Sequence, residues 1–230
     1  SNEKYPVPTK TIKAGMALNY QYIHLVSSSN STLPTDVWVQ SSGIVKPQMA
    51  MQYSVGYFRN FKDNMFETSI EVYFKHLWNQ IEYGESYVNE LNVDQELGYV
   101  FGKGRAYGAE FFLKKRTGKL NGWIGYTISR SDRKFKELNE GKVFPAKYDR
   151  THDLSININY DINKEWSVGA TFVYATGNAI TPANALSLIE FNPMIGYASR
   201  NSYRVPAYHR MDVALTYTPI PKRRPNRRWK

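Results

Sequence analysis

The sequence contains no cysteine. A chain without thiols forms neither a disulfide nor a thiolate metal site, so redox chemistry gives no sign of its compartment. It also lacks any run of about 18 apolar residues, which excludes a transmembrane helix. The first residues, SNEKYPVPTK, are polar and proline-rich and do not form a signal peptide. We therefore expect either that an export signal has been removed or that this is an internal piece of a longer protein.

The positive charge is concentrated at one end of the chain. The formal net charge is +10, but six of the 30 lysines and arginines lie in the last nine positions, KRRPNRRWK. Nucleic-acid binding requires basic residues spread over a surface and interleaved with stacking aromatics. We therefore expect the tail to be a polar turn and predict no nucleic-acid partner.

The sequence has few signals of catalysis or metal binding. The four histidines, His24, His76, His152 and His209, lie far apart and lack the spacing of a metal site. The glycine-rich stretch GKGRAYG at 102–108 misses the spacing of a phosphate loop and leads into a strand, not a helix. No nucleophile elbow or HExxH motif is present. We therefore predict no metal, no cofactor and no enzymatic activity.

What the sequence has in abundance is strict two-residue alternation. From His152 to Ile162, the residues His152, Leu154, Ile156, Ile158, Tyr160 and Ile162 alternate with Asp153, Ser155, Asn157, Asn159 and Asp161. This is the pattern of a β-strand between two different solvents. The same alternation predicts eight strands, at 11–25, 49–60, 65–78, 105–116, 121–131, 151–162, 165–176 and 207–218.

The lengths of strands and connections distinguish two all-β folds. The predicted strands run to ten residues or more, close to the roughly nine to eleven that a tilted strand needs to cross a bilayer. Short polar connections at 60–64, 117–121 and 161–165 alternate with long ones at 26–48, 79–104, 132–150 and 177–206. An antiparallel up-and-down transmembrane barrel places its short turns on one side of the membrane and its long loops on the other. The pattern favours this fold over a soluble sandwich.

Five segments carry a resemblance to a known family. They are IVKPQMAMQYSVGYFRNF, FGKGRAYGAEFFLKKRTGKLNGWIGYTISRSDR, FPAKYDRTHDLSININY, WSVGATFVYATGNAIT and YRVPAYHRMDVALTY. Taken in this order, one per hairpin, they resemble the C-terminal part of the barrel of TonB-dependent outer-membrane receptors, in the Bacteroidetes-type branch. The resemblance covers about residues 11 to 218.

The resemblance implies a 22-stranded barrel closed by an N-terminal plug, in the outer membrane of a Gram-negative bacterium. Residues 1–230 would then be a partial barrel domain, about eight strands near strands 13 to 20, without the plug or the closing strands. The implied function is TonB-coupled uptake of a large scarce nutrient such as an iron-siderophore, cobalamin or a glycan. Implied partners are outer-membrane lipid, lipopolysaccharide, the nutrient, and the TonB complex through the missing N-terminal part. The alternative is a small outer-membrane or soluble β-barrel that binds a ligand without transporting it.

Two groups of residues are candidates for ligand binding. Aromatic side chains in long loops can stack on a ligand, and four lie in the predicted loops: Trp38, Tyr83, Tyr87 and Tyr99. A charge cluster flanks the loop at 132–150, with the cations Arg130, Arg133, Lys147 and Arg150 beside Asp132 and Asp149. We expect Arg130, Arg133 and Arg150 either to form an ion-pair lattice near the extracellular mouth or to contact an anionic ligand or lipopolysaccharide.

Overall fold

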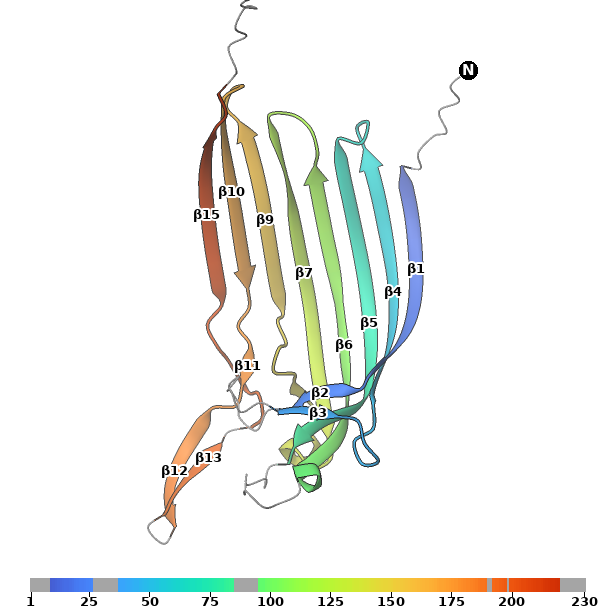
Figure 1. Ribbon diagram of the computed structural model, residues 1–230, viewed down its shortest axis with the longest axis vertical. Coiled ribbons are helices and arrows are strands. Elements are labelled where there is room, and N and C mark those ends of the chain that lie inside the picture. Colours follow the sequence, from blue (N-terminus) through green and yellow to red (C-terminus); the bar gives the residue numbers. More distant parts are fainter. Residues whose placement is uncertain (1–8, 27–36, 85–94, 190–191, 198, 220–230) are drawn as a thin grey trace, which may run out of the picture.

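Eight long strands form one antiparallel sheet in the computed structural model, which describes residues 9–26, 37–84, 95–189, 192–197 and 199–219 (Figure 1). In spatial order they are β1 (Lys10–Gln21), β4 (Gln48–Phe61), β5 (Phe66–Tyr83), β6 (Tyr99–Lys115), β7 (Leu120–Phe135), β9 (His152–Asp161), β10 (Trp166–Ala175) and β15 (Tyr208–Tyr217). Each of the eight predicted strands has its counterpart here. The all-β, up-and-down prediction is therefore confirmed.

The sheet is open in this chain. Among the described residues, β1 pairs only with β4, and β15 pairs only with β10, so two edges are left without a partner strand. An unpaired edge presents a row of free backbone donors and acceptors. The eight strands therefore form a section of a barrel wall and not a small closed barrel. None of the described helices is long and apolar enough to cross a membrane.

The short connections at 62–65, 116–119 and 162–165 lie together at the upper end in Figure 1, which we call the turn end. Their residue types explain their tightness. Lys62, Asp63 and Asn64 have φ angles of 50°, 54° and 62°, and the backbone N–H of Met65 donates to Lys62 O at 2.9 Å. Aspartate and asparagine tolerate this left-handed backbone better than most residues.

The long connections meet at the opposite end, which we call the loop end: the described parts of 22–47, 84–98, 136–151 and 176–207. They contain short elements that the alternation did not predict. These are β2 (Ile23–Val26) with β3 (Val37–Gln40), β8 (Phe144–Pro145) beside β7, β11 (Ala179–Ile180) with β14 (Tyr203–Arg204), β12 (Ala183–Ile189) with β13 (Asn192–Tyr197), and the 3-10 helices η1 (Gln95–Gly98) and η2 (Asn139–Gly141).

The wall strands extend further into the loop end than predicted. The alternation placed the ends of three strands at residues 78, 105 and 131, whereas β5 ends at Tyr83, β6 begins at Tyr99 and β7 ends at Phe135. The predicted strand at 11–25 is instead two strands, because β1 ends at Gln21 and β2 turns away to pair with β3. The prediction of a continuous loop at 79–104 is therefore wrong.

A β-bulge in β5 explains one of these differences. The pairing of β5 with β6 shifts between Leu77 and Gln80, and Asn79 has a φ of 53°. The Asn79 side chain donates to Pro47 O at 2.9 Å, which fixes the bulge against the chain that enters β4. Because a bulge adds one residue to one strand, the faces of odd and even residues exchange beyond it. The alternation read from the sequence breaks at the same point.

The register gives the wall two faces. One cross-strand row, on what we call the apolar face, consists of Ile12, Tyr57, Ile70, Phe111, Tyr126, Leu154, Tyr174 and His209. The next row on the opposite, polar face consists of Lys13, Gly56, Glu71, Glu110, Thr127, Asp153, Ala175 and Tyr208. A hollow on the polar face is lined mainly by polar side chains, among them Glu71, Glu110 and Ser155.

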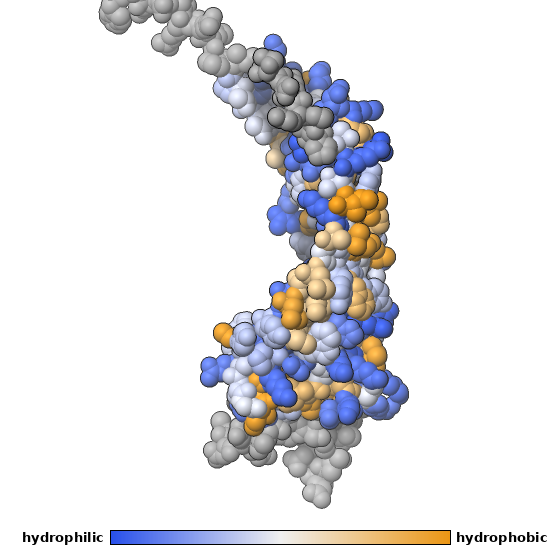
Figure 2. Space-filling view, turned by 90° about the vertical axis from the view of Figure 1, so that its right-hand side faces the viewer, coloured by the Kyte–Doolittle hydropathy of each residue, from blue (hydrophilic) through white to orange (hydrophobic). Residues whose placement is uncertain are grey.

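The apolar face is not covered by protein. Even in the centre of the sheet, Ile70 is 48% exposed, Phe111 41% and Ile124 39%. Figure 2 shows hydrophobic residues gathered at mid-height, with hydrophilic residues more frequent above and below. An exposed apolar surface of this extent is unfavourable in water, and hydrocarbon is the solvent that suits it. The soluble-sandwich alternative is therefore wrong for this chain, because its apolar side would be buried.

Two glycines allow neighbouring strands to approach closely. Gly122 has a φ of 147°, and a Cβ there would lie 2.1 Å from Asn157 O on β9. A Cβ at Gly102 would lie 2.5 Å from Lys134 O on β7. The second glycine belongs to the GKGRAYG stretch, which lies inside β6. Gly102 therefore serves strand packing, and the stretch is part of the strand itself and not a loop that leads into it.

Candidate functional site

Two small hydrophobic cores lie at the loop end. The first contains Val26, Val45, Ile81, Tyr83 and Tyr99, and packs the β2–β3 hairpin onto the ends of β5 and β6. The second contains Phe135, Leu138 and Phe144, with Val100 packed against it, and the rings of Phe135 and Phe144 are 6.0 Å apart. These cores hold the beginnings of the loops against the wall.

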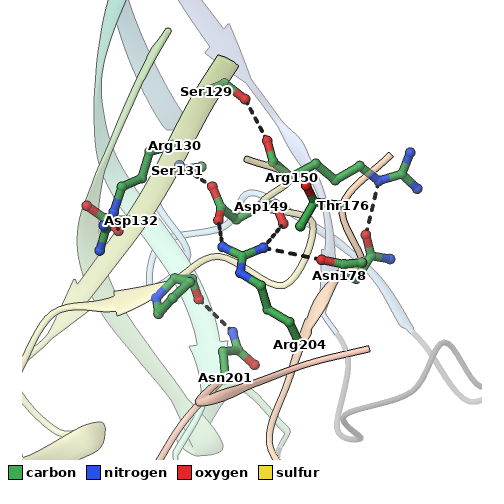
Figure 3. A network of polar contacts seen from close by, with 12 residues as sticks. Ser129, Arg130, Ser131, Asp132, Asp149, Arg150, Thr176, Asn178, Asn201 and Arg204 are labelled. Atoms are coloured by element: carbon green, nitrogen blue, oxygen red, sulfur yellow. Dashed lines mark hydrogen bonds and ion pairs between the residues drawn. The ribbon is translucent and has the colours of Figure 1, made fainter. Parts of the chain in front are cut away.

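Asp149 is the centre of a polar network that joins two loops to β7 (Figure 3). Its side chain is 1% exposed, and one oxygen accepts from the backbone N–H of Ser131 at 2.5 Å. The other oxygen forms an ion pair with Arg204 of β14, whose guanidinium also donates to Asp149 O at 2.8 Å and Gly177 O at 3.2 Å. This one buried carboxylate therefore links β7, the chain that enters β9 and β14 through charge-assisted hydrogen bonds.

Three further contacts fasten the last loop. Arg200 forms an ion pair with Glu82 of β5 at 2.8 Å, and its backbone N–H donates to Asn139 Oδ1 at 3.2 Å. The Asn201 side chain donates to Pro145 O at 2.8 Å. The described part of the last loop is thus tied to β5 and to the loop before it. The loop end is a connected layer and not a set of independent loops.

The predicted aromatic residues have different environments. Trp38 is 67% exposed on β3, as expected of a residue that can stack on a ligand. Tyr83 and Tyr99 are only 6% and 8% exposed, because they form a cross-strand pair with rings 5.2 Å apart in the first hydrophobic core. The expectation that these two are exposed loop aromatics is wrong. Tyr87 lies outside the described residues.

The predicted arginine cluster is divided by the pleat of β7. Arg130 lies on the apolar face and pairs with Asp132 at 3.0 Å. Arg133, three residues further on, lies on the polar face, opposite Gly104 of β6. Arg150 is exposed in the loop, where its Nε donates to Asn178 Oδ1 at 3.2 Å. The three arginines therefore do not form a single site, and their contact with a ligand stays a prediction.

Arg133 is the inward-facing cation of the three. Its Nη1 is buried, and no hydrogen-bond partner for it is found among the described residues. Glu82 lies within electrostatic range of it, but the Glu82 carboxylate already pairs with Arg200. A guanidinium with an unused N–H donor can form a hydrogen bond and an ion pair with an anion on the polar side of the wall.

Sequence reasoning missed Arg200 and Arg204. Their carboxylate partners lie 118 and 55 residues away along the chain. No local motif marks such a pair, so neither arginine carried a signal in the sequence.

His24 is a titratable group buried at the loop end. It is 0% exposed, and its Nε2 lies 3.2 Å from Ser41 Oγ. Burial lowers the pKa of the His24 imidazole below its ordinary value, because the charged form loses its hydration. Among the described residues, no group of histidine, aspartate and glutamate side chains is arranged to hold a metal ion.

Comparison with known proteins places this geometry in a family. The TonB dependent receptor-like, beta-barrel family matches residues 15–230. No curated protein sequence matches the chain. Solved structures with the same fold include the ferripyoverdine receptor of the Pseudomonas aeruginosa outer membrane, with a TM-score of 0.60 and 16% identity over 91% of this chain. The ferric-catecholate import receptor Fiu of Escherichia coli K12 matches with a TM-score of 0.58 and 17% identity over 93% of this chain.

The chain corresponds to a section of these receptors. It spans 25% of the ferripyoverdine receptor and 27% of Fiu. Receptors of this family reside in the Gram-negative outer membrane and act in transport, not in catalysis. Together with the open wall and its exposed apolar face, the match over residues 15–230 shows that this chain belongs to the TonB-dependent receptors and forms part of their β-barrel.

Proposed function

We propose that residues 1–230 are a partial barrel domain of an outer-membrane receptor that imports a large, scarce nutrient with energy supplied through TonB. The family match over residues 15–230 carries this proposal. The structure supports it through an apolar face suited to lipid, a polar face suited to a hydrated interior, and long connections gathered at one end. The plug and the contact with TonB would belong to the part of the receptor outside this chain.

The cargo that we propose is a ferric siderophore. Two solved neighbours are described as receptors for ferripyoverdine and for ferric catecholates, which supports this class over cobalamin or a glycan. At the loop end, Trp38 would offer an exposed ring, and Arg133 and Arg150 would offer cations to an anionic chelate. The fastened loops would form a firm platform that holds these side chains at the mouth of the barrel.

The test uses the full-length receptor that contains this chain, in a strain that lacks its own copy. We expect uptake of radioactive iron from a panel of ferric siderophores to depend on the receptor and on TonB. We expect Trp38→Ala to weaken siderophore binding roughly tenfold, since loss of an aromatic stacking contact is worth about 0.5–1.5 kcal/mol beyond its area. Trp38→Phe should restore most of the binding.

The control is growth on a form of iron that enters by another route, which Trp38→Ala should not change. If the receptor took up cobalamin or a glycan and no siderophore, the proposed cargo would be wrong, but the proposal of TonB-coupled transport would still hold. Uptake of all three classes without any dependence on the receptor would overturn the proposal itself.

A further inference from the structure

One carboxylate at the loop end interacts with two cations. Glu82, near the end of β5, forms an ion pair with Arg200 Nη2 at 2.8 Å. The same carboxylate acts electrostatically on Arg133 of β7. Arg133 itself forms no ion pair with any carboxylate in the described part of the chain. The negative charge of Glu82 is therefore shared between a paired arginine and an unpaired one.

The Arg133 side chain crosses β6 towards β5. Arg133 stands opposite Gly104 of β6, and a Cβ at Gly104 would lie 2.5 Å from Arg133 Nη1 and 3.1 Å from Leu77 Cδ1 of β5. The missing side chain of Gly104 thus leaves the space that the guanidinium occupies. Nη1 is buried there and has no hydrogen-bond partner among the described residues. Because water screens a buried charge only weakly, Arg133 acts strongly on the charged groups around it.

Arg200 fastens a turn of the last loop, residues 199–202, which we call the Arg200 turn. The side chain of Arg200 links this turn to β5 through the ion pair with Glu82. The backbone N–H groups of residues 200, 201 and 202 donate at 3.2, 2.9 and 3.2 Å to Asn139 Oδ1, Thr181 Oγ1 and Ser199 O. Hydrogen-exchange protection of these three amides therefore reports how firmly the turn is held.

We propose that Arg133 is an anion subsite that controls how firmly the Arg200 turn is held. Without an anion, Arg133 attracts the Glu82 carboxylate and repels the guanidinium of Arg200, and both effects weaken the ion pair. An anion bound at Arg133 cancels its charge, so Glu82 interacts with Arg200 alone and the turn is held more tightly. By linkage, a tightly held turn raises the affinity of Arg133 for the anion by the same factor.

The anion that suits this subsite is a carboxylate or phosphate group of the cargo, because these are the oxyanions that a guanidinium binds well. The inference rests on the proposed function, in which Arg133 offers its charge to an anionic chelate, and adds a regulatory consequence to it. Occupation of the polar side of the wall would reach the last loop through a single shared carboxylate.

The test is hydrogen exchange with mass spectrometry on the purified full-length receptor in detergent, without cargo. Arg133→Met removes the charge and keeps a long side chain, whereas Arg133→Lys keeps the charge. Lys134→Gln is the control for total charge, because Lys134 is the next residue and is exposed on the opposite face of β7. Inorganic phosphate at constant ionic strength is the probe for the subsite. Protease resistance of the barrel verifies that each variant is folded.

We expect the amides of residues 200–202 to exchange about fivefold more slowly in Arg133→Met than in the unmodified receptor, a factor at the lower end of couplings between two sites. Arg133→Lys and Lys134→Gln should exchange at the unmodified rate. Glu82→Gln, which removes the shared carboxylate, should exchange faster. Phosphate should slow the exchange of the unmodified receptor and leave Arg133→Met unchanged.

Unchanged or faster exchange in Arg133→Met would overturn the inference, because the charge of Arg133 would then not weaken the turn. Equal slowing in Arg133→Lys would assign the effect to packing and contradict it as well. A phosphate response that is absent from the unmodified receptor, or equally large in Arg133→Met, would mean an adventitious ion only. Since exchange is measured without cargo, these results would leave the transport proposal standing, and iron uptake tests that proposal separately.

Discussion

The wall and the loop end use the same kinds of apolar residues in opposite ways. Every fully buried hydrophobic residue in the described part of the chain lies at the loop end or where a wall strand enters it, as Leu138, Phe144 and Ala179 illustrate. In the wall, Ile70, Phe111 and Ile124 remain exposed. The loop end is thus built like a small water-soluble protein, whereas the wall presents its hydrophobic side outward. One chain folds against two solvents.

The largest expected effect comes from a charge placed on the apolar face of the wall. Ile156 and Asn157 are neighbours on β9 and project to opposite faces. Ile156→Lys should cost about 2–4 kcal/mol in membrane stability, the usual penalty for a lysine that faces lipid near the bilayer centre. Asn157→Lys should cost far less, although it loses the Asn157 hydrogen bond to Thr171 Oγ1 at 3.0 Å.

The measurement is the fraction of folded full-length receptor recovered in the outer membrane. Ile156→Lys should reduce it strongly and Asn157→Lys should leave most of it. Equal recovery of the two variants would mean that the faces of the wall have been assigned the wrong way round.

A smaller effect, confined to the loop end, is expected from Asp149→Ala. The substitution removes the acceptor of the Ser131 N–H and the carboxylate partner of Arg204. Hydrogen bonds to charged groups contribute about 1.5–3 kcal/mol, so the segments around residues 145–150 and 203–205 should exchange their amide hydrogens faster. Strands β9 and β10 should keep their protection.

Asp161→Ala at the turn end is the control, because Asp161 is exposed and lies at the far end of β9. Hydrogen exchange with mass spectrometry gives both readouts. If Asp149→Ala loosened the whole wall as much as the loops, the two regions would not be separate folding environments.

The smallest effect is a pH dependence of the β2–β3 hairpin. Because burial lowers the pKa of His24, the stability gained from its neutral form is present above the ordinary value of 6.5 and is lost as the pH falls below it. Amide protection in β2 and β3 should therefore decrease between about pH 7 and pH 5. His24→Leu should abolish this dependence, whereas His209→Gln in the wall should not. A hairpin equally protected at both pH values would contradict the assignment.

The two regions also differ in how well the sequence predicts them. The wall strands could be predicted because successive side chains project alternately into lipid and into a polar environment. Apolar and polar residues therefore alternate over ten residues or more. The predicted strand at 165–176 corresponds to β10 at Trp166–Ala175, for example. At the loop end, packing against distant segments replaces alternation. The burial of Tyr83 against Tyr99 depends on a strand pairing that no local pattern reveals.

The arginines show the same limit at the scale of a few residues. Arg130 and Arg133 are close in sequence, and proximity suggested one cluster. A separation of three on a strand places two side chains on opposite faces, so the pleat of β7 divides them. The same rule, applied outward from Tyr107 and Arg130, would have placed Lys103, Arg105 and Lys134 on one face. The shared face of these cations could therefore be read from the sequence, whereas the partners of Arg200 and Arg204 could not.

The bulge at Asn79 lies on the border between the two regions. The bulge contains one extra residue, so odd and even residues change faces at Asn79. The segment beyond the bulge therefore does not have to follow the alternation of the wall strand before it. Insertions, deletions or wholesale exchange of the loop beyond β5 can then occur without rotating a lipid-facing residue inward. A receptor built in this way can change what its outer surface recognises while its membrane-spanning strands stay in register, and Asn79 marks a natural junction for grafting foreign loops onto this wall.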